Sequence, residues 1–184
     1  MHTPDRSQLA PARIRPAELP AVLAEARSGG PVDHALVLLS LYAGLRPGEI
    51  ADLAEGGAER TGDRWRVTVA GRRARTIAVP RAVGAALAVL AERRAAHGGP
   101  FLPTVRDAAD VEEELHTVLM DARVADPRPF GLRAHLADRL AELAAVPTDH
   151  LFAYLGSAGV DPAVLPAGWD LAIAELIDRR LVEE

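Results

Sequence analysis

The chain has 184 residues, with 49% hydrophobic and only 4% aromatic residues, and it contains neither cysteine nor lysine. This length supports one domain with a sizeable core of alanine, leucine and valine, and the first two of these residues favour helix. The absence of cysteine excludes disulfides and thiolate metal sites, and the formal net charge of −5 argues against a protein that coats nucleic acid non-specifically.

The chain lacks the features of a membrane or secreted protein. Its N-terminal residues do not show the charged-then-apolar pattern of a signal peptide, and no uncharged run approaches the roughly 20 residues that span a bilayer. We therefore expect a cytoplasmic protein. The histidines are scattered without metal-ligand spacing, so no metal or other cofactor is expected. The use of arginine in place of lysine indicates a GC-rich bacterial genome.

Apolar periodicity predicts helices over most of the chain. Residues 1–13 are polar and proline-containing, which indicates a flexible leader, and residues 14–184 are expected to form a single domain with 161–184 as a C-terminal helical tail. Helices are predicted at about 16–26, 32–43, 47–53, 81–97, 107–123, 132–145 and 170–182, with a short one between Thr148 and Gly156. We expect the helix at 32–43 to be buried on nearly every side, and Thr148 to cap the helix that Gly156 closes.

The period changes to two between residues 64 and 79. Apolar and polar residues alternate there around a turn at 70–73, which predicts an antiparallel hairpin. The expected fold class is therefore mainly α with a small antiparallel hairpin or three-stranded sheet.

Charge is distributed unevenly along the chain. Residues 60–81 hold seven arginines against one aspartate, whereas residues 161–184 hold six acids against two arginines. A polyanion could therefore bind the arginine-rich face in spite of the acidic average.

Four segments carry the functional signal, and their order and spacing matter more than any one of them. They are Gly44-Leu45-Arg46-Pro47-Gly48-Glu49, the hairpin at 65–80, Gly131-Leu132-Arg133 and Tyr154-Leu155-Gly156-Ser157. Together they resemble the catalytic domain of the tyrosine recombinase (phage integrase) family over about residues 14–160. The resemblance implies metal-free breaking and rejoining of DNA, which needs a tyrosine nucleophile, guanidiniums that stabilise phosphate charge, and a general acid for the leaving oxygen.

The two family arginines are present. Arg46 matches the first, with Glu49 at the place of the usual supporting acid, and Arg133 matches the second. A planar guanidinium donates two hydrogen bonds to a phosphate and keeps its charge, so both side chains suit phosphate binding. The alternative for Arg46 is structural: its guanidinium pairs with Glu49 across one helical turn or caps buried carbonyls.

The hairpin supplies three more candidates for phosphate binding, Arg72, Arg73 and Arg75. By resemblance Arg72 lies where the family has a lysine, but the pKa of arginine is too high for an efficient proton donor near neutrality. The alternative is a solvated hairpin whose arginines bind nothing.

The remaining family positions are degenerate. Phe130 lies where the resemblance places the first histidine, Ser157 where it places the second histidine-type residue, and Pro166 close to where it places the tyrosine. Tyr154 is the only late tyrosine, on a helix expected to face the core. His135 lies two residues after Arg133, so its side chain should point well around the helix.

The sequence thus favours a catalytically inactive recombinase-like domain that binds DNA through retained arginines, alone or with a partner. The alternative is a protein-interaction or oligomerisation module without nucleic-acid contact, which the acidic net charge and acidic C-terminal helix favour. An active recombinase is the least favoured hypothesis. The apolar stripe of the last helix is expected to be core, although the family resemblance also allows docking on a homo-oligomer neighbour or a recombinase-like partner; its residues are Ile173, Leu176, Ile177 and Leu181.

Overall fold

The computed structural model describes residues 13–53, 57–71, 74–157 and 159–182, so nearly all of the predicted leader lies outside the described residues. The helices are α1 (Leu19–Gly29), α2 (Pro31–Leu41), α3 (Pro47–Asp52), α4 (Arg81–His97), α5 (Ala108–Asp121), α6 (Phe130–Glu142), α7 (Thr148–Leu155) and α8 (Trp169–Arg180). Two single 3-10 turns, η2 (Pro16–Glu18) and η5 (Pro162–Val164), precede α1 and α8. The strands are β1 (Ala58–Thr61), β2 (Arg64–Val69) and β3 (Arg75–Ala78).

The predicted fold class is confirmed: the domain is mainly α with one small antiparallel sheet. The predicted hairpin is β2 and β3, in which Val67 lies opposite Ile77, and β1 pairs with the other edge of β2. Val67 and Ile77 are fully buried, so this face of the sheet belongs to the core. The two central turn residues, 72 and 73, lie outside the described residues.

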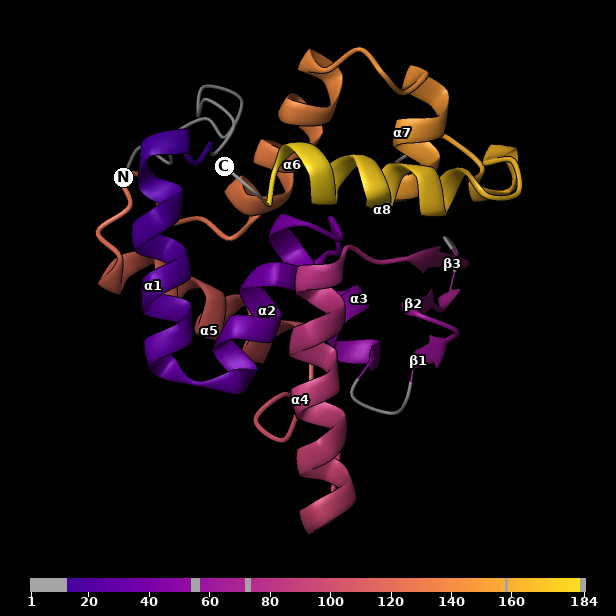
Figure 1. Cartoon of the computed structure of the whole chain (residues 1–184). Coiled ribbons are helices and arrows are strands. Elements are labelled where there is room, and N and C mark those ends of the chain that lie inside the picture. Colours follow the sequence, from indigo (N-terminus) through magenta and orange to yellow (C-terminus); the bar gives the residue numbers. More distant parts are fainter. Residues whose placement is uncertain (1–12, 54–56, 72–73, 158, 183–184) are drawn as a thin grey trace, which may run out of the picture.

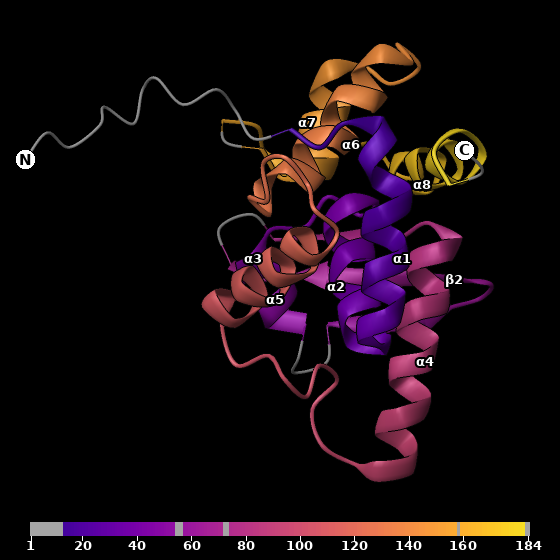
Figure 2. The same ribbon diagram turned by 90° about the vertical axis from the view of Figure 1, so that its left-hand side faces the viewer.

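Helix α2 is the centre of the domain, as its all-round apolar sequence predicts. Every residue from Ala35 to Leu41 is buried, and α1, α4, α5 and α6 all pack against it. Figures 1 and 2 both show α6, α7 and α8 gathered at one end of the molecule, above α2 and the sheet. The candidate site lies there, at the C-terminal end of α7.

Two local predictions about helix ends are wrong. Helix α6 begins at Phe130, two residues before the predicted start, with Pro129 as the preceding residue. Thr148 does not cap α7: it is already the first helical residue, and Pro147 before it has no side-chain oxygen to accept a hydrogen bond. The predicted end at Gly156 is correct, because this residue adopts the left-handed conformation with φ 61°.

The acidic C-terminal helix packs on the arginine-rich sheet of its own chain. The carboxylate of Asp170 accepts hydrogen bonds from the Arg66 guanidinium at 2.6 Å and from the backbone N–H of Ala78 at 2.9 Å. In the last turn of α8, Asp178 pairs with Arg64. The basic and acidic segments therefore neutralise each other in part. Arg64 and Arg66 are both paired with acids of α8, although 34% of the Arg66 side chain stays exposed.

The apolar stripe of α8 also lies against its own domain. Ile173 and Ile177 are fully buried in the core, and Leu176 and Leu181 are partly buried against it. Figure 1 shows α8 lying across β3 and the start of α4. The prediction of core packing is confirmed for these residues. None of the helices within the described ranges is both long and apolar enough to cross a membrane.

Candidate phosphate-binding site

Three arginine side chains converge on the C-terminal end of α7. The Arg75 Nε, the Arg133 Nη2 and the Arg46 Nη2 donate to the carbonyl oxygens of residues 154, 155 and 156, at 2.9, 2.8 and 2.8 Å respectively. The last carbonyls of a helix have no intrahelical partners and form the negative end of its dipole, so cations are favoured there. We call this set of three arginines the arginine clasp.

Each arginine of the clasp comes from a different element, and the local sequence explains its position. Arg46 is the residue before α3, whose first position is occupied by Pro47, and the chain reaches it through a turn at Gly44 with φ 65°. Arg75 is the first residue of β3. Arg133 is on the first turn of α6, and its Nε donates to the Gly44 carbonyl at 2.9 Å, which ties α6 to that turn.

Arg75 is a buried structural side chain. Only 4% of it is exposed, and its guanidinium makes two hydrogen bonds to the Glu49 carboxylate, at 2.8 Å and 3.3 Å. Glu49 also accepts the backbone N–H of Arg46 at 2.9 Å. The supporting acid therefore pairs with Arg75 and not with the Arg46 guanidinium, contrary to the structural alternative drawn from the sequence. The Arg75 guanidinium therefore faces the protein interior and not a surface that a phosphate could reach.

Arg46 has a structural contact and also faces open space. Its guanidinium donates to the Gly156 carbonyl, as the carbonyl-capping alternative expects, and this is its one side-chain hydrogen bond within the described residues. It makes no ion pair with any described residue, and a guanidinium carries five N–H donors. Arg46 lines two hollows: one of 460 Å³ with Arg133 and Phe130, and one of 800 Å³ with Glu49 and Ser157.

Of the other positions taken from the family resemblance, Ser157 and Phe130 lie near Arg133, whereas Pro166 does not line the same hollow. The Ser157 hydroxyl lies 3.4 Å from the Arg133 Nη2, and Phe130 lies at the edge of the 460 Å³ hollow with 56% of its surface exposed. Pro166 is exposed in the loop before α8, on the wall of another hollow that Arg66 also lines. Arg72 and Arg73 lie outside the described residues.

Both tyrosines of the chain are buried. Tyr154 has no exposed surface, and its hydroxyl donates to the Ala78 carbonyl at 3.3 Å, which confirms that this side chain faces the core. Tyr42 is 7% exposed, and its hydroxyl donates to the Leu181 carbonyl at 3.4 Å. Burial raises the pKa of both phenols, so neither favours the phenolate that would attack phosphorus.

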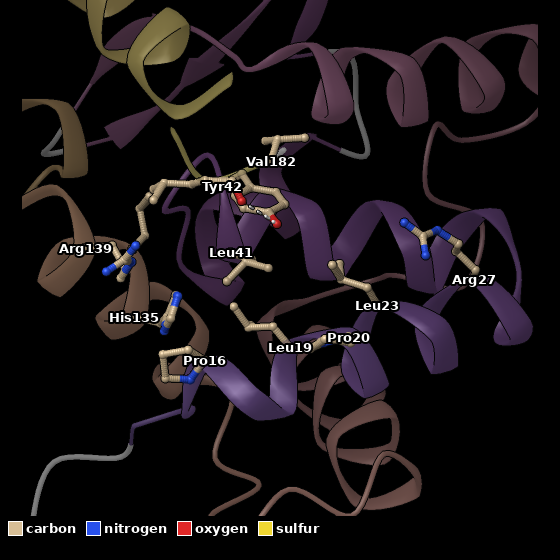
Figure 3. A pocket seen from close by; sticks show the side chains of 12 residues that line it. Pro16, Leu19, Pro20, Leu23, Arg27, Leu41, Tyr42, His135, Arg139 and Val182 are labelled. Carbon is tan, nitrogen blue, oxygen red and sulfur yellow. Dashed lines mark hydrogen bonds between the residues drawn. The ribbon is translucent and has the colours of Figure 1, made fainter. Parts of the chain in front are cut away.

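His135 lies in a different hollow from Arg133, as its position on the helix predicts. Figure 3 shows its ring beside Pro16 and Leu19 in a mostly apolar hollow of 480 Å³, with Arg27 and Arg139 towards opposite ends. Its Nδ1 lies 3.1 Å from the Ile14 carbonyl, and burial lowers the pKa of the ring. His135 therefore does not replace the missing histidine beside the arginine clasp.

Sequence reasoning missed Arg128, the third arginine among the residues that line the 460 Å³ hollow. Arg128 lies at its rim, and its Nε donates to the Asp126 carboxylate at 2.7 Å. Arg128 could have been identified from the sequence, because it lies only two residues before Phe130. No group of three or more histidine, aspartate or glutamate side chains with the geometry of a metal site occurs among the described residues.

The helices and the three-stranded sheet form the catalytic-type fold of tyrosine recombinases. The crystal structure of XerA recombinase superposes with a TM-score of 0.71 and 18% identity, covering 98% of this chain and 67% of that chain. The post-cleavage complex of XerH site-specific recombinase bound to palindromic difH substrate superposes with a TM-score of 0.64 and 14% sequence identity. The match covers 99% of this chain and 56% of the XerH chain. The pre-cleavage complex of XerH bound to difH substrate superposes with a TM-score of 0.61 and 15% sequence identity. This match covers 98% of this chain and 54% of the XerH chain.

This chain therefore spans little more than half of XerH. No protein-family model matches the sequence, and no curated protein matches it either. At these identities the likeness establishes the fold and leaves the activity to be argued from the residues.

Proposed function

We propose that this domain binds DNA through the phosphate backbone and does not cleave it. The observation that carries the proposal is the convergence of Arg46 and Arg133, the two arginines of the family motifs, on one open hollow. Arg46 contributes N–H donors beyond the one that binds the Gly156 carbonyl. Phosphate oxygens are the acceptors that a guanidinium fork fits best.

Two further observations support DNA as the ligand. XerH, which shares the fold, is described in complex with its difH DNA substrate both before and after cleavage. The sequence also places two arginines, Arg72 and Arg73, at the turn between β2 and β3. In this proposal the two turn arginines add phosphate contacts, and binding is weak because only a few phosphates are neutralised.

The burial of both tyrosines supports the non-cleaving part of the proposal. Strand cleavage in this family needs a phenol that reaches phosphorus, whereas both phenols of this chain are buried and donate to backbone carbonyls. The resemblance places a tyrosine near Pro166, where the side chain offers no nucleophile.

Binding is tested by fluorescence anisotropy with a labelled DNA fragment over a series of salt concentrations. Arg46→Gln is expected to weaken binding about tenfold at low salt and to reduce the slope of log affinity against log salt by about one, because one phosphate contact is lost. The control is Arg94→Gln, an exposed arginine of α4 away from the hollow, which should bind like the wild type.

The double variant with Arg72→Glu and Arg73→Glu should weaken binding further, because it reverses two charges. The proposal is wrong if the wild type does not bind DNA at low salt. It is also wrong if both the Arg46 variant and the double variant bind as tightly as the wild type.

Cleavage is tested separately with a nicked suicide substrate, which traps a covalent protein–DNA intermediate when a tyrosine attacks. We expect no adduct on a denaturing gel after long incubation with the wild type, and an identical result with Tyr154→Phe. A covalent adduct, mapped by mass spectrometry to any residue of this chain, would contradict the non-cleaving part of the proposal while leaving the binding part intact.

A further inference from the structure

An aromatic ring lies exposed beside the two family arginines. Phe130 is the first residue of α6 and has 56% of its surface exposed, although most large apolar side chains of this domain are buried. It precedes Arg133 by three residues, so the two side chains lie on the same face of the helix. Both therefore line the 460 Å³ hollow together with Arg46.

The lining of this hollow combines apolar walls with positive charge. Pro47 and Pro129 contribute apolar surface, and three arginines line it against a single acid, the exposed Glu112. A volume of 460 Å³ lies within the range of small-ligand sites, which are typically apolar with a few polar groups that fix orientation. The ligand that complements such a lining has a flat ring and an anionic group within one small unit.

A nucleotide has this chemistry, but intact duplex DNA does not offer it to the hollow. In a duplex the faces of the bases are covered by their neighbours in the stack, and only the phosphates are available to Arg46. A base that is unpaired, as in a single strand, can place its face on an aromatic ring. The phenylalanine ring has no hydrogen-bonding group, so the stack would accept any of the four bases.

We propose that the hollow binds an unpaired nucleotide of single-stranded DNA, with its phosphate on Arg46 and Arg133 and its base stacked on Phe130. This inference rests on the proposed function and narrows its ligand: single-stranded DNA is preferred over duplex. Phe130, at the position where the family resemblance places a histidine, thus becomes a determinant of ligand preference.

The test compares a single-stranded 12-mer carrying 2-aminopurine with a blunt 12-base-pair duplex. We expect the wild type to bind the single strand more tightly and to change its 2-aminopurine fluorescence on binding. Phe130→Ala should weaken single-strand binding about tenfold, remove the fluorescence change and leave duplex binding within a factor of two of the wild type. Phe130→Trp should retain single-strand binding, because indole also offers an aromatic face.

The control variant is Phe152→Ala, which removes another exposed phenylalanine, on α7 and outside the residues that line this hollow. It should leave both affinities unchanged. Circular dichroism of each variant establishes that it is folded.

Failure of this inference differs from failure of the proposed function. If Arg46→Gln weakens both DNA forms while Phe130→Ala changes neither affinity, the stacking inference is wrong and phosphate binding stands. If the wild type binds the duplex as tightly as the single strand, or more tightly, the stacking inference is likewise wrong and phosphate binding stands. If neither DNA form binds at low salt, the proposed function and the inference both fall.

Discussion

Replacing Arg75 with methionine is expected to lower the free energy of unfolding by about 3–5 kcal/mol, the range for removing one partner of a buried ion pair. The variant leaves the Glu49 carboxylate, which is only 12% exposed, without the guanidinium that makes two hydrogen bonds to it. It also removes the donor to the Tyr154 carbonyl. Urea unfolding followed by circular dichroism measures the loss.

The Glu49 partner provides the matched control. Glu49→Gln alone keeps a hydrogen-bonding group of the same size but removes the charge, so it should destabilise as well, because the Arg75 guanidinium then lacks a counterion. The double variant should be less destabilised than the sum of the two single variants, since it contains neither uncompensated charge. Additive losses, or a loss below about 1 kcal/mol for Arg75→Met, would show that the pair is not a unit of the fold.

Apolar periodicity predicted most of the fold, because it reports which face of an element is buried. The helix at 32–43 reads as apolar on all sides, and α2 is indeed buried from Ala35 to Leu41. The change to a period of two located β2 and β3. Thr148 shows the limit of such rules: it is a favoured capping residue, but the chain enters α7 one residue earlier than the rule assumed.

The partners of the arginines could not be predicted, because they depend on the tertiary fold. Arg75 pairs with Glu49 across 26 positions of sequence, and it binds the Tyr154 carbonyl across 79. The structural alternative drawn from the sequence paired Glu49 with the Arg46 guanidinium one helical turn away, whereas in the structure the carboxylate pairs with the Arg75 guanidinium. The sequence shows that residues 60–81 are basic and residues 161–184 are acidic. In the structure, acids of the second segment form ion pairs with arginines of the first.

In the candidate site too, the sequence motifs identified the residues but not the contacts that those residues make. The motifs identified Arg46 and Arg133, and the structure brings both to one hollow. The motifs did not indicate that the same two guanidiniums also donate hydrogen bonds to the carbonyls at the end of α7. A side chain that anchors a helix end is also fixed in direction, which favours ligand binding because less conformational entropy is lost when a phosphate arrives.

Replacing Gly156 with alanine is expected to lower the free energy of unfolding by about 3–5 kcal/mol. Two costs combine. Gly156 has φ 61°, a conformation that costs other residues roughly 1–2 kcal/mol. A Cβ atom there would also lie 2.5 Å from the Arg75 Nη1, which must move although it is held by Glu49.

Gly159→Ala separates these two costs. Gly159 also has positive φ, at 84°, but a Cβ atom built there meets no described atom within 4 Å. Its substitution should therefore show only the backbone cost, roughly 1–2 kcal/mol. The difference between the two variants measures how firmly the arginine clasp holds its place, because the collision with Arg75 is present in one and absent in the other. Equal losses for the two variants would mean that Arg75 moves aside freely, and the clasp would then not be the rigid support on which the position of Arg46 depends.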